Sequence, residues 1–248
     1  MLIPFTELAQ YGINPTAVCH VGAHLAQERS AYAAMGIGDV LWVEANPMLI
    51  DELIENVAPY GHQVRCACLA SRAGQYLTFH IAEATNYSNK GQSSSLLPLG
   101  LHLTQHPEVS YVRDIAVTTK TLDEVTAEAI PDWLGPGGMM GNFDTQGTEL
   151  DIMRGGPITL AACDSIYCEV NLAPMYEGAG LLPDLDAFLN GAGFECVRIE
   201  TAGCRRVHCQ HSGHNRHVSW GDGIWVRTES PRPWSETHPD DWEDWFSE

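Results

Sequence analysis

The stretch TAVCHVGAHLAQERSAYAAMGIGDVLWVEAN, residues 16–46, decides the fold of this chain. It contains two short apolar runs, at 16–21 and 39–43, with an amphipathic segment between them. Short apolar runs that alternate with amphipathic segments predict parallel strands joined by crossover helices. Gly22 follows the first run and Glu44 follows the second. The stretch therefore predicts a βαβ unit with a ligand at the carboxyl ends of its strands.

The same alternation continues along the chain. Apolar runs predict parallel strands at 64–69, 139–143 and 165–170, two strands that close the sheet at 194–199 and 223–227, and additional strands that could be antiparallel at 76–81 and 115–119. Helices are predicted at 25–35, 47–57, 149–154 and 182–190. The sequence thus predicts an α/β fold with a mostly parallel central sheet and helices on both faces.

The length of 248 residues fits one domain over residues 1–228, followed by a short tail over 229–248. The tail holds seven acidic residues and the tryptophans Trp234, Trp242 and Trp245. We expect the tail to lie outside the main core. Two interpretations of it are open: it is disordered, or its tryptophan rings dock against the same chain or against the mate in a homodimer.

The net charge of −19 excludes several classes of function. A surface this negative repels a phosphate backbone, and the densest basic stretch is only Arg205–Arg206, so nucleic acid is not an expected partner. No apolar segment is long enough to span a membrane, and residues 1–7 lack the features of a signal peptide. Most of the eight cysteines lie in apolar runs, where a reduced thiol is usual. We expect a cytoplasmic protein that acts on small molecules.

Polar or glycine residues follow four of the predicted strands where these end: Gly22-Ala23-His24, Glu44-Ala45-Asn46, Asp144-Thr145-Gln146 and Glu169-Val170-Asn171. In an open α/β sheet, ligands bind outside the carboxyl ends of the strands. Gly22 lets a ligand approach the backbone, and Glu44 follows after about twenty residues, the spacing at which an acid bonds a ribose diol. The pair fits NAD or another adenosine cofactor, and it also fits a tight turn beside a solvated acid.

Separate blocks between residues 17 and 227 add to this pair, in the order CHVGAH (19–24), WVEANP (42–47), GQSSSLL (91–97), TLD (121–123), NFDTQGTEL (142–150), EVN (169–171), GF (193–194) and HVSWGDG (217–223). In this order the blocks resemble the FkbM-type S-adenosylmethionine-dependent methyltransferases. The chain departs from many members at His20 and His24, where Asp and Asn are common. It also lacks the longer glycine pattern of dinucleotide folds, which disfavours NAD. The resemblance implies a class I methyltransferase fold, Rossmann-like, with an antiparallel last strand.

The resemblance further implies that S-adenosylmethionine binds at these strand ends, at a site formed by Gly22, Ala23, His24, Glu44, Ala45, Cys68, Ser94, Asp144 and Gln146. A histidine beside the cofactor could bond its carboxylate, or it could simply pack at the strand end. The implied reaction is transfer of the sulfonium methyl to a hydroxyl of a small-molecule acceptor, a sugar or glycoside. The alternatives are a hydroxyl of a non-sugar natural product, and a non-catalytic module that binds an adenosine cofactor.

A base or a metal ion would ease deprotonation of such a hydroxyl. Asp144, Glu169 and Asn171 follow two adjacent predicted strands and offer the oxygen donors that Mg²⁺ accepts. In the alternative, Asp144 orients the cofactor while Glu169 and Asn171 bind substrate hydroxyls. His217 is the first candidate for the general base, with Asp144 as the other catalytic candidate, although His217 could instead cap a loop. Asp222 is expected to fix the turn before the last strand.

Overall fold

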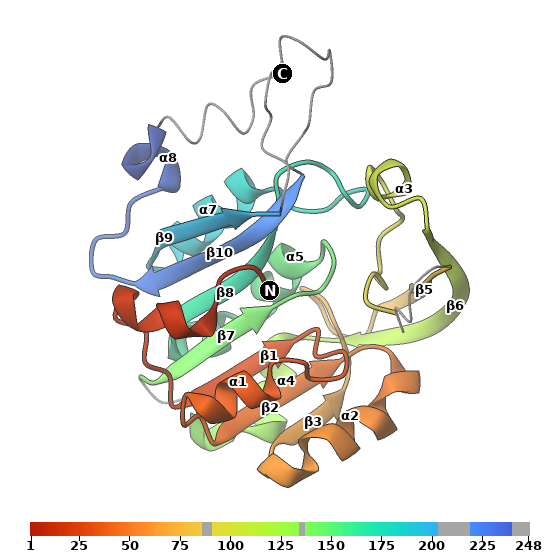
Figure 1. Cartoon of the computed structure of the whole chain (residues 1–248), viewed down its shortest axis with the longest axis horizontal. Coiled ribbons are helices and arrows are strands. Elements are labelled where there is room, and N and C mark those ends of the chain that lie inside the picture. Colours follow the sequence, from red (N-terminus) through yellow and green to blue (C-terminus); the bar gives the residue numbers. More distant parts are fainter. Residues whose placement is uncertain (86–90, 134–136, 203–218, 240–248) are drawn as a thin grey trace.

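The computed structural model describes residues 1–85, 91–133, 137–202 and 219–239, and its centre is a seven-stranded sheet (Figure 1). The strands lie in the order β3 (Gln63–Cys66), β2 (Asp39–Glu44), β1 (Ala17–Val21), β7 (Met139–Phe143), β8 (Cys163–Asn171), β10 (Trp220–Arg227) and β9 (Phe194–Thr201). The chain builds outward from β1 to β3 and then returns to β7 on the other side of β1. The topological switch point therefore lies between β1 and β7, where ligands bind in open α/β sheets.

The direction of the strands agrees with the prediction. Neighbouring strands from β3 to β8 are parallel, and β10 runs antiparallel to both β8 and β9. The expected mostly parallel sheet with an antiparallel last strand is confirmed. β10 begins at Trp220 and not at residue 223, so it includes a segment that the sequence interpretation had assigned to a turn.

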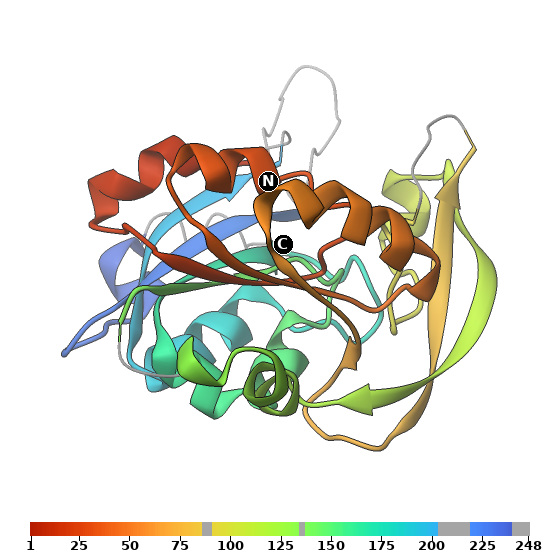
Figure 2. The ribbon, with the colours of Figure 1, turned by 90° about the horizontal axis from the view of Figure 1, so that it is seen from below.

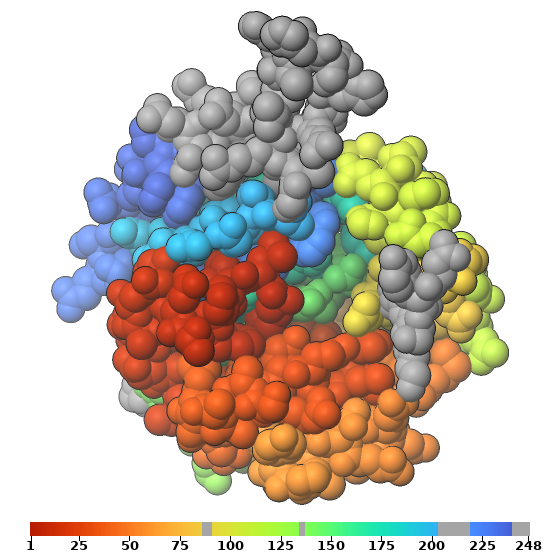
Figure 3. Space-filling view, viewed as in Figure 1, coloured from red at the N-terminus to blue at the C-terminus, as the bar shows by residue number. Residues whose placement is uncertain are grey.

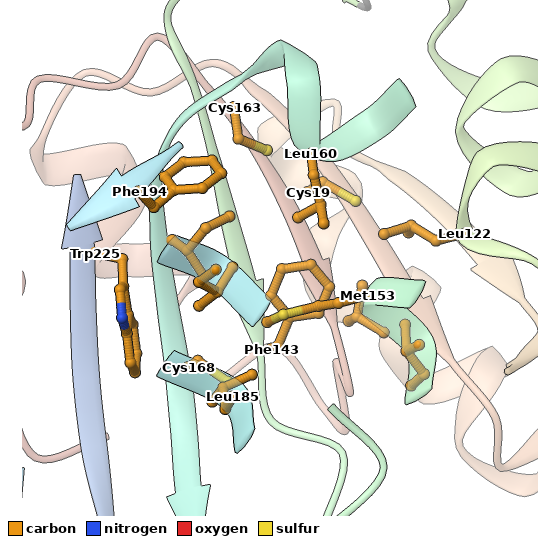
Figure 4. Close-up of a cluster of buried hydrophobic side chains, with 14 of the residues drawn as sticks. Cys19, Leu122, Phe143, Met153, Leu160, Cys163, Cys168, Leu185, Phe194 and Trp225 are labelled. Carbon is orange, nitrogen blue, oxygen red and sulfur yellow. The ribbon is translucent and has the colours of Figure 1, made fainter. Parts of the chain in front are cut away.

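Helices cover both faces of the sheet (Figure 2). One face carries η1 (Phe5–Tyr11), α1 (Arg29–Ala34), η2 (Pro47–Leu49), α2 (Ile50–Val57) and η3 (Ala58–Tyr60), and the other carries α4 (Leu122–Ala129), η4 (Pro131–Trp133), α5 (Glu149–Arg154), α6 (Pro157–Ala162) and α7 (Leu182–Gly191). Alternate strand residues point to opposite faces, so Val18 and Trp42 join one hydrophobic core while Cys19 and Val43 join the other. The core with Cys19 extends across the sheet to Trp225 (Figure 4).

A second sheet of three strands stands beside the carboxyl ends of β1 and β2 (Figure 1). Its order is β4 (Cys68–Leu69), β6 (Val109–Lys120) and β5 (Tyr76–Ala84). β5 and β6 are antiparallel, as the sequence allowed, and both are longer than predicted. The short helix α3 (His102–Gln105) precedes β6. Together these elements face the strand ends where the sequence places the ligand site.

The first predicted helix starts late. It begins at Arg29 and not at residue 25. His24 and Ala26 have φ angles of 46° and 55°, a left-handed conformation that a helix cannot contain. The residues after Gly22 therefore form an irregular turn, which leaves their backbone N–H groups free of helical hydrogen bonding.

The predicted strand at 64–69 is divided between the two sheets. β3 ends at Cys66 and pairs with β2, whereas β4 begins at Cys68 and pairs with β6. Ala67 lies between them, and its backbone N–H donates to the carbonyl oxygen of Glu44 at 2.9 Å. One apolar run thus supplies both the edge of the central sheet and the edge of the second sheet.

The first part of the acidic tail is not outside the core. α8 (Trp234–Thr237) places Trp234 in the core, with only 4% of its surface exposed. The Trp234 backbone N–H donates to Asp186 Oδ2 at 2.8 Å, and Trp225 Nε1 donates to Asp186 Oδ1 at 2.9 Å. The tail's other tryptophans, at 242 and 245, lie outside the described residues. The division of the chain at residue 228 stays a prediction.

The expectations about cysteines and membranes concern the same described residues. The six cysteines among them are free thiols, and all but Cys66 are buried. None of the helices in the described ranges is both long and apolar enough to cross a lipid bilayer.

Candidate functional site

The carboxyl ends of β1, β7 and β8 open into a cleft of about 720 Å³ (Figure 3). On one side of the cleft lie the strand-end residues Gly22, Asp144 and Glu169 with the start of β10, which pairs with β8 beside Glu169, and on the other side lies α3. A smaller apolar cavity adjoins it and shares the lining residues Gly22, His24, Gln92, Asp144 and Gln146. The two cavities therefore adjoin each other at the turns after β1 and β7.

Gly22 makes the closest approach between two strand-end turns. It has a φ of 86°, and a Cβ placed there would lie 1.8 Å from the carbonyl oxygen of Asp144. Only glycine is compatible with both the backbone conformation and the contact. The N–H groups of Gly22 and Ala23 donate to the carbonyl oxygen of Val43 at 2.9 and 3.0 Å, so the turn is also fixed to β2.

Glu44 ends β2 and holds the neighbouring turns together. Its Oε2 accepts the backbone N–H of His24 at 2.8 Å, and its Oε1 accepts that of Asn46 at 2.7 Å. Burial raises the pKa of Glu44, and the N–H donors act in the opposite direction. Each carboxylate oxygen can accept a further hydrogen bond, so a carboxylate held in this way can bind a diol at the rim of the smaller cavity.

The smaller cavity is an apolar slot. Ala45, Cys68, Phe79 and Leu96 line it; Cys68 and Phe79 belong to one hydrophobic cluster, and Ala45 and Leu96 pack against that cluster. Burial raises the pKa of the Cys68 thiol to about 12, so the thiol is uncharged and apolar in character. Such a slot, with Glu44 at its rim, suits a flat heterocycle that carries a ribose.

Ser94 belongs to the same slot, but its hydroxyl has a structural partner. Ser94 Oγ accepts the backbone N–H of Ala82 at 3.0 Å, and the next serine, Ser95, donates from Oγ to the carbonyl oxygen of Gln146 at 2.8 Å. The serine-rich loop is thus attached both to β5 and to the turn after β7. The predicted involvement of this loop in a ligand site agrees with its position between the two.

The turn after β7 brings two acids together around one amide. Gln146 has a φ of 59°, and its Nε2 donates to Asp144 Oδ1 and to Glu169 Oε2, both at 2.8 Å. Tyr176 donates its hydroxyl to Gln146 Oε1 at 2.7 Å. Burial, followed by the charges of Asp144 and Glu149, holds the pKa of Glu169 well above its usual range. The amide thus donates to both carboxyl groups, and Asp144 also hydrogen-bonds Glu169 directly, which favours a protonated Glu169.

Glu149 fixes the turn after β7 through hydrogen bonds to the backbone of that turn. Its carboxylate accepts the N–H groups of Thr145 at 2.8 Å and Gly147 at 3.0 Å. Burial raises the pKa of Glu149 to about 7, although the N–H donors act against it. The sequence interpretation quoted Glu149 only as part of a motif, and the structure gives it the role of fixing the turn that carries Asp144 and Gln146.

The predicted magnesium ligands lie in one cleft. Asp144, Glu169 and Asn171 all line the cleft. The amide nitrogen of Gln146 donates to the first two. No group of three or more His, Cys, Asp or Glu side chains within the described ranges is arranged to hold a metal ion. Magnesium therefore has no support here, and the role of these three residues as metal ligands stays a prediction.

The predicted cofactor residues differ in whether they line one of the two cavities. Gly22, His24, Glu44, Ala45, Cys68, Ser94, Asp144 and Gln146 line one cavity or both. Ala23 does not, because its side chain packs into the core below the turn. The binding role of all these residues stays a prediction. His217, the predicted base, lies outside the described residues.

Two further sequence interpretations concern His20 and Asp222. His20 is 2% exposed, and its ring packs near that of Trp42. Its Nδ1 lies 3.0 Å from the hydroxyl of Tyr32. His20 is therefore packed at the strand end, although it also lines the cleft. Burial lowers the pKa of His20 to about 4. Asp222 does not fix a turn; it lies within β10, lines the cleft and accepts the hydroxyl of Tyr167 at 2.6 Å.

Several residues of the cleft were not predicted as site residues: His102, His106, Glu108, Tyr176 and Trp220. They come from α3, from the loop before β6, from the segment after β8 and from the start of β10. Trp220 lies in one of the quoted sequence blocks, which was a usable signal. The others lie in segments without periodicity, and only the packing of distant segments brings them together.

The strand order, the switch point at β1 and β7, and the glycine and acid at the strand ends define the chain as a Rossmann-like α/β protein that binds its ligand at the carboxyl ends of the strands. The family is given by the sequence: residues 20–196 match the model of the methyltransferase FkbM domain, and the chain belongs to this family. The suspected family and the class I methyltransferase fold are thereby confirmed. The search of curated proteins finds no match.

Solved structures of methyltransferases show distant likeness to the chain. The methyltransferase FkbM from Methylobacillus flagellatus is 9% identical with a TM-score of 0.46, over 86% of this chain and 44% of that longer one. Magnesium protoporphyrin IX methyltransferase from Synechocystis with bound SAH is 11% identical with a TM-score of 0.46, over 90% and 80%. The ribosomal protein L11 methylase from Lactobacillus delbrueckii is 14% identical with a TM-score of 0.40, over 90% and 78%. Family membership therefore rests on the family model.

Proposed function

We propose that the chain is an S-adenosylmethionine-dependent O-methyltransferase that methylates a hydroxyl of a sugar or glycoside. The observation that carries the proposal is that two adjoining cavities share the lining residues of the turns after β1 and β7. An apolar slot with Glu44 at its rim opens past Gly22 and Asp144 into a larger polar cleft. A nucleoside cofactor and a separate acceptor can thus meet at the turn after β1.

The slot residues fit the cofactor by their chemistry. Phe79, Leu96 and Cys68 would hold the adenine ring, and the Glu44 carboxylate would accept the ribose hydroxyls. The turn from Gly22 to His24 would hold the methionine end, because its backbone approaches the cleft without a side chain at Gly22. When bound, S-adenosylmethionine supplies an electrophilic sulfonium methyl group.

The larger cleft fits a neutral polyhydroxylated acceptor. Its described lining contains the acids Glu28, Glu108, Asp144, Glu169 and Asp222 but no lysine or arginine. An anionic acceptor such as a sugar phosphate would meet repulsion there. Tyr176 and Trp220 add aromatic rings next to the hydrogen-bonding amide of Asn171. Rings together with polar groups of this kind bind molecules that have both apolar faces and hydroxyl edges.

Asp144 is the group that we propose to bind the acceptor hydroxyl and to receive its hydrogen bond. It follows the strand next to β1, and Gln146 fixes one of its carboxylate oxygens at 2.8 Å. His217 stays our candidate for the base that removes the proton. Because the Gln146 amide donates to both Asp144 and Glu169, both carboxyl groups have a partner within the chain, and we propose that the reaction needs no magnesium at these residues.

Two measurements test the proposal. Calorimetry with S-adenosylmethionine tests the cofactor site, and the absence of binding would contradict the roles of Gly22 and Glu44. Mass spectrometry then follows methyl transfer to methyl glucoside, mannoside, rhamnoside and fucoside, with a phenol as the non-sugar comparison. Methylation of the phenol alone would favour a non-sugar acceptor, and cofactor binding without any product would favour a binding module.

The roles of metal and base have their own tests in the same assay. Activity that is unchanged by EDTA is expected, and loss of activity with EDTA that Mg²⁺ restores would contradict the metal-free proposal. His217→Ala should reduce turnover at neutral pH by about 100-fold or more. Full turnover of this variant would remove His217 from the proposal.

A further inference from the structure

His102 lies on the side of the cleft that faces away from the slot, on the short helix α3. Only 5% of its surface is exposed. The start of α3 is fixed by three backbone hydrogen bonds, from Gly100 N to Met175 O at 2.8 Å, from Leu101 N to Pro174 O at 3.0 Å and from His102 N to Met175 O at 3.2 Å. The position of the imidazole is therefore set by the segment after β8, the strand that carries Glu169.

One nitrogen of this imidazole is enclosed without a partner. His102 Nδ1 is buried and makes no hydrogen bond. Protonation of the ring would place an N–H at Nδ1 with nothing to accept it, and burial together with His106 lowers the pKa of His102 to about 4. The ring is neutral at pH 7. An enclosed N–H without an acceptor costs more than an enclosed lone pair, so the proton of this ring, which lines the cleft, belongs on Nε2, the nitrogen that is not enclosed without a partner.

His102 is also connected to the strand-end residues through side chains. The centroid of its ring lies 5.5 Å from that of Tyr176. Tyr176 donates to Gln146 at 2.7 Å, and Gln146 donates to Asp144 at 2.8 Å. His102 and Asp144 therefore line the same cleft and are linked by packed, hydrogen-bonded side chains.

We propose that His102 binds the methyl acceptor by donating a hydrogen bond from Nε2 to an oxygen of an uncharged, polyhydroxylated molecule. This inference rests on the proposed function, since it assigns a residue to the acceptor of that reaction. Packing alone does not explain the imidazole, because an apolar side chain would fill the same place without an enclosed polar atom. A side chain that makes the packing less stable is expected at a position where that side chain binds a ligand.

Steady-state kinetics with the methyl glycoside that gives most product tests the inference. His102→Leu removes the donor, and we expect the KM for the glycoside to rise about 10-fold, with kcat changed less than about 3-fold. The Kd for S-adenosylmethionine should be unchanged, and the Tm should not fall. His102→Gln keeps an N–H donor and should retain a KM within about 3-fold of the wild type. His80→Leu changes a histidine on β5 that lines neither cavity, and it should leave KM unchanged.

A glycoside KM that His102→Leu leaves unchanged would overturn the inference, and so would an equal rise in His80→Leu. Nitrogen NMR of protein labelled at histidine gives a readout besides activity. We expect the Nε2–H tautomer of His102 at pH 6.5, and a shift of this signal when the glycoside is added with S-adenosylhomocysteine; the Nδ1–H tautomer would overturn the inference. If the proposed function is wrong, the wild-type protein will methylate no acceptor at all. That result differs from the ones above, and it would overturn the inference together with the proposed function.

Discussion

The turns after β1 and β2 and the opposite side of the cleft are held by different donors. At the turns, backbone N–H groups of residues 22–24 and 46 donate to the carbonyl oxygen of Val43 and to the carboxylate of Glu44. On the opposite side, backbone N–H groups at α3 donate to the segment after β8, and tyrosine hydroxyls add further bonds: Tyr176 donates to Gln146, and Tyr111 donates its hydroxyl to the carbonyl oxygen of Leu97 at 2.6 Å. A backbone donor stays when a side chain is changed, whereas a hydroxyl can be removed by itself. We therefore expect the side where we propose that the cofactor binds, the cofactor side, to be the more rigid one, and the side where we propose that the acceptor binds, the acceptor side, to be the adjustable one.

The largest expected effect tests the rigidity of the cofactor side. Gly22→Ala places a Cβ 1.8 Å from the carbonyl oxygen of Asp144, so the two turns must separate. We expect a loss of unfolding free energy of at least about 4 kcal/mol, measured by urea denaturation, or failure to fold.

Gly36→Ala is the matched control for this prediction. Gly36 has a φ of 79°, but no atom lies within 4 Å of the added Cβ, so only the conformational cost of about 1–2 kcal/mol remains. Equal losses in the two variants would show that the contact with Asp144 does not constrain the turn.

The second effect concerns the dependence of stability on pH. The pKa of His20 is about 4 in the folded chain, against an ordinary value of 6.5, so the unfolded chain binds the proton first as pH falls. The stability from this residue is complete above pH 6.5 and is lost progressively down to pH 4, by up to about 3 kcal/mol. In urea denaturation, His20→Gln should lose less stability than the wild type over this interval. Parallel curves for His20→Gln and the wild type would contradict the prediction.

The third effect concerns cofactor affinity. Glu44→Gln replaces one acceptor oxygen by an amide nitrogen, which cannot accept the N–H of His24 or Asn46. We expect the Kd for S-adenosylmethionine to rise about 30-fold, equivalent to about 2 kcal/mol, in calorimetry. Glu55→Gln, on the exposed side of α2, is the control and should not change Kd. An unchanged Kd in Glu44→Gln would place the cofactor elsewhere.

The smallest effect tests the adjustable side. Tyr176→Phe removes the hydroxyl that donates to Gln146 Oε1 at 2.7 Å. We expect the KM for the acceptor to rise about 5-fold, equivalent to about 1 kcal/mol, with cofactor Kd within 2-fold. Tyr76→Phe, at a residue that is 87% exposed on β5, should change neither quantity. A larger change in cofactor Kd than in acceptor KM would mean that the two sides are not built differently.

The cofactor side could be predicted from the sequence because its residues follow apolar runs directly. Gly22 and Glu44 are each the residue after a predicted strand, so their positions depend only on the sheet. The helix after Gly22 was placed too early because nothing in the sequence marks Ala26, a non-glycine residue, as left-handed. α4 had a local signal, the capping box between Thr121 and Glu124, that the sequence interpretation did not use.

The acceptor side could not be predicted in this way. α3 has four residues and no periodicity, and it is positioned by bonds to residues more than seventy positions later in the chain. Trp234 likewise owes its burial to Asp186, which accepts its backbone N–H across 48 residues. Such placements depend on long-range packing, and neither residue type nor local pattern records it.

The single residue between β3 and β4 has a mechanical consequence. The chain leaves the central sheet at Cys66 and enters the second sheet at Cys68, and Ala67 between them is tied to the carbonyl oxygen of Glu44 at 2.9 Å. A connection of one residue is too short to let the two sheets move apart at this junction. We therefore expect the apolar slot to keep its width when a ligand binds, because folding of the chain already sets that width.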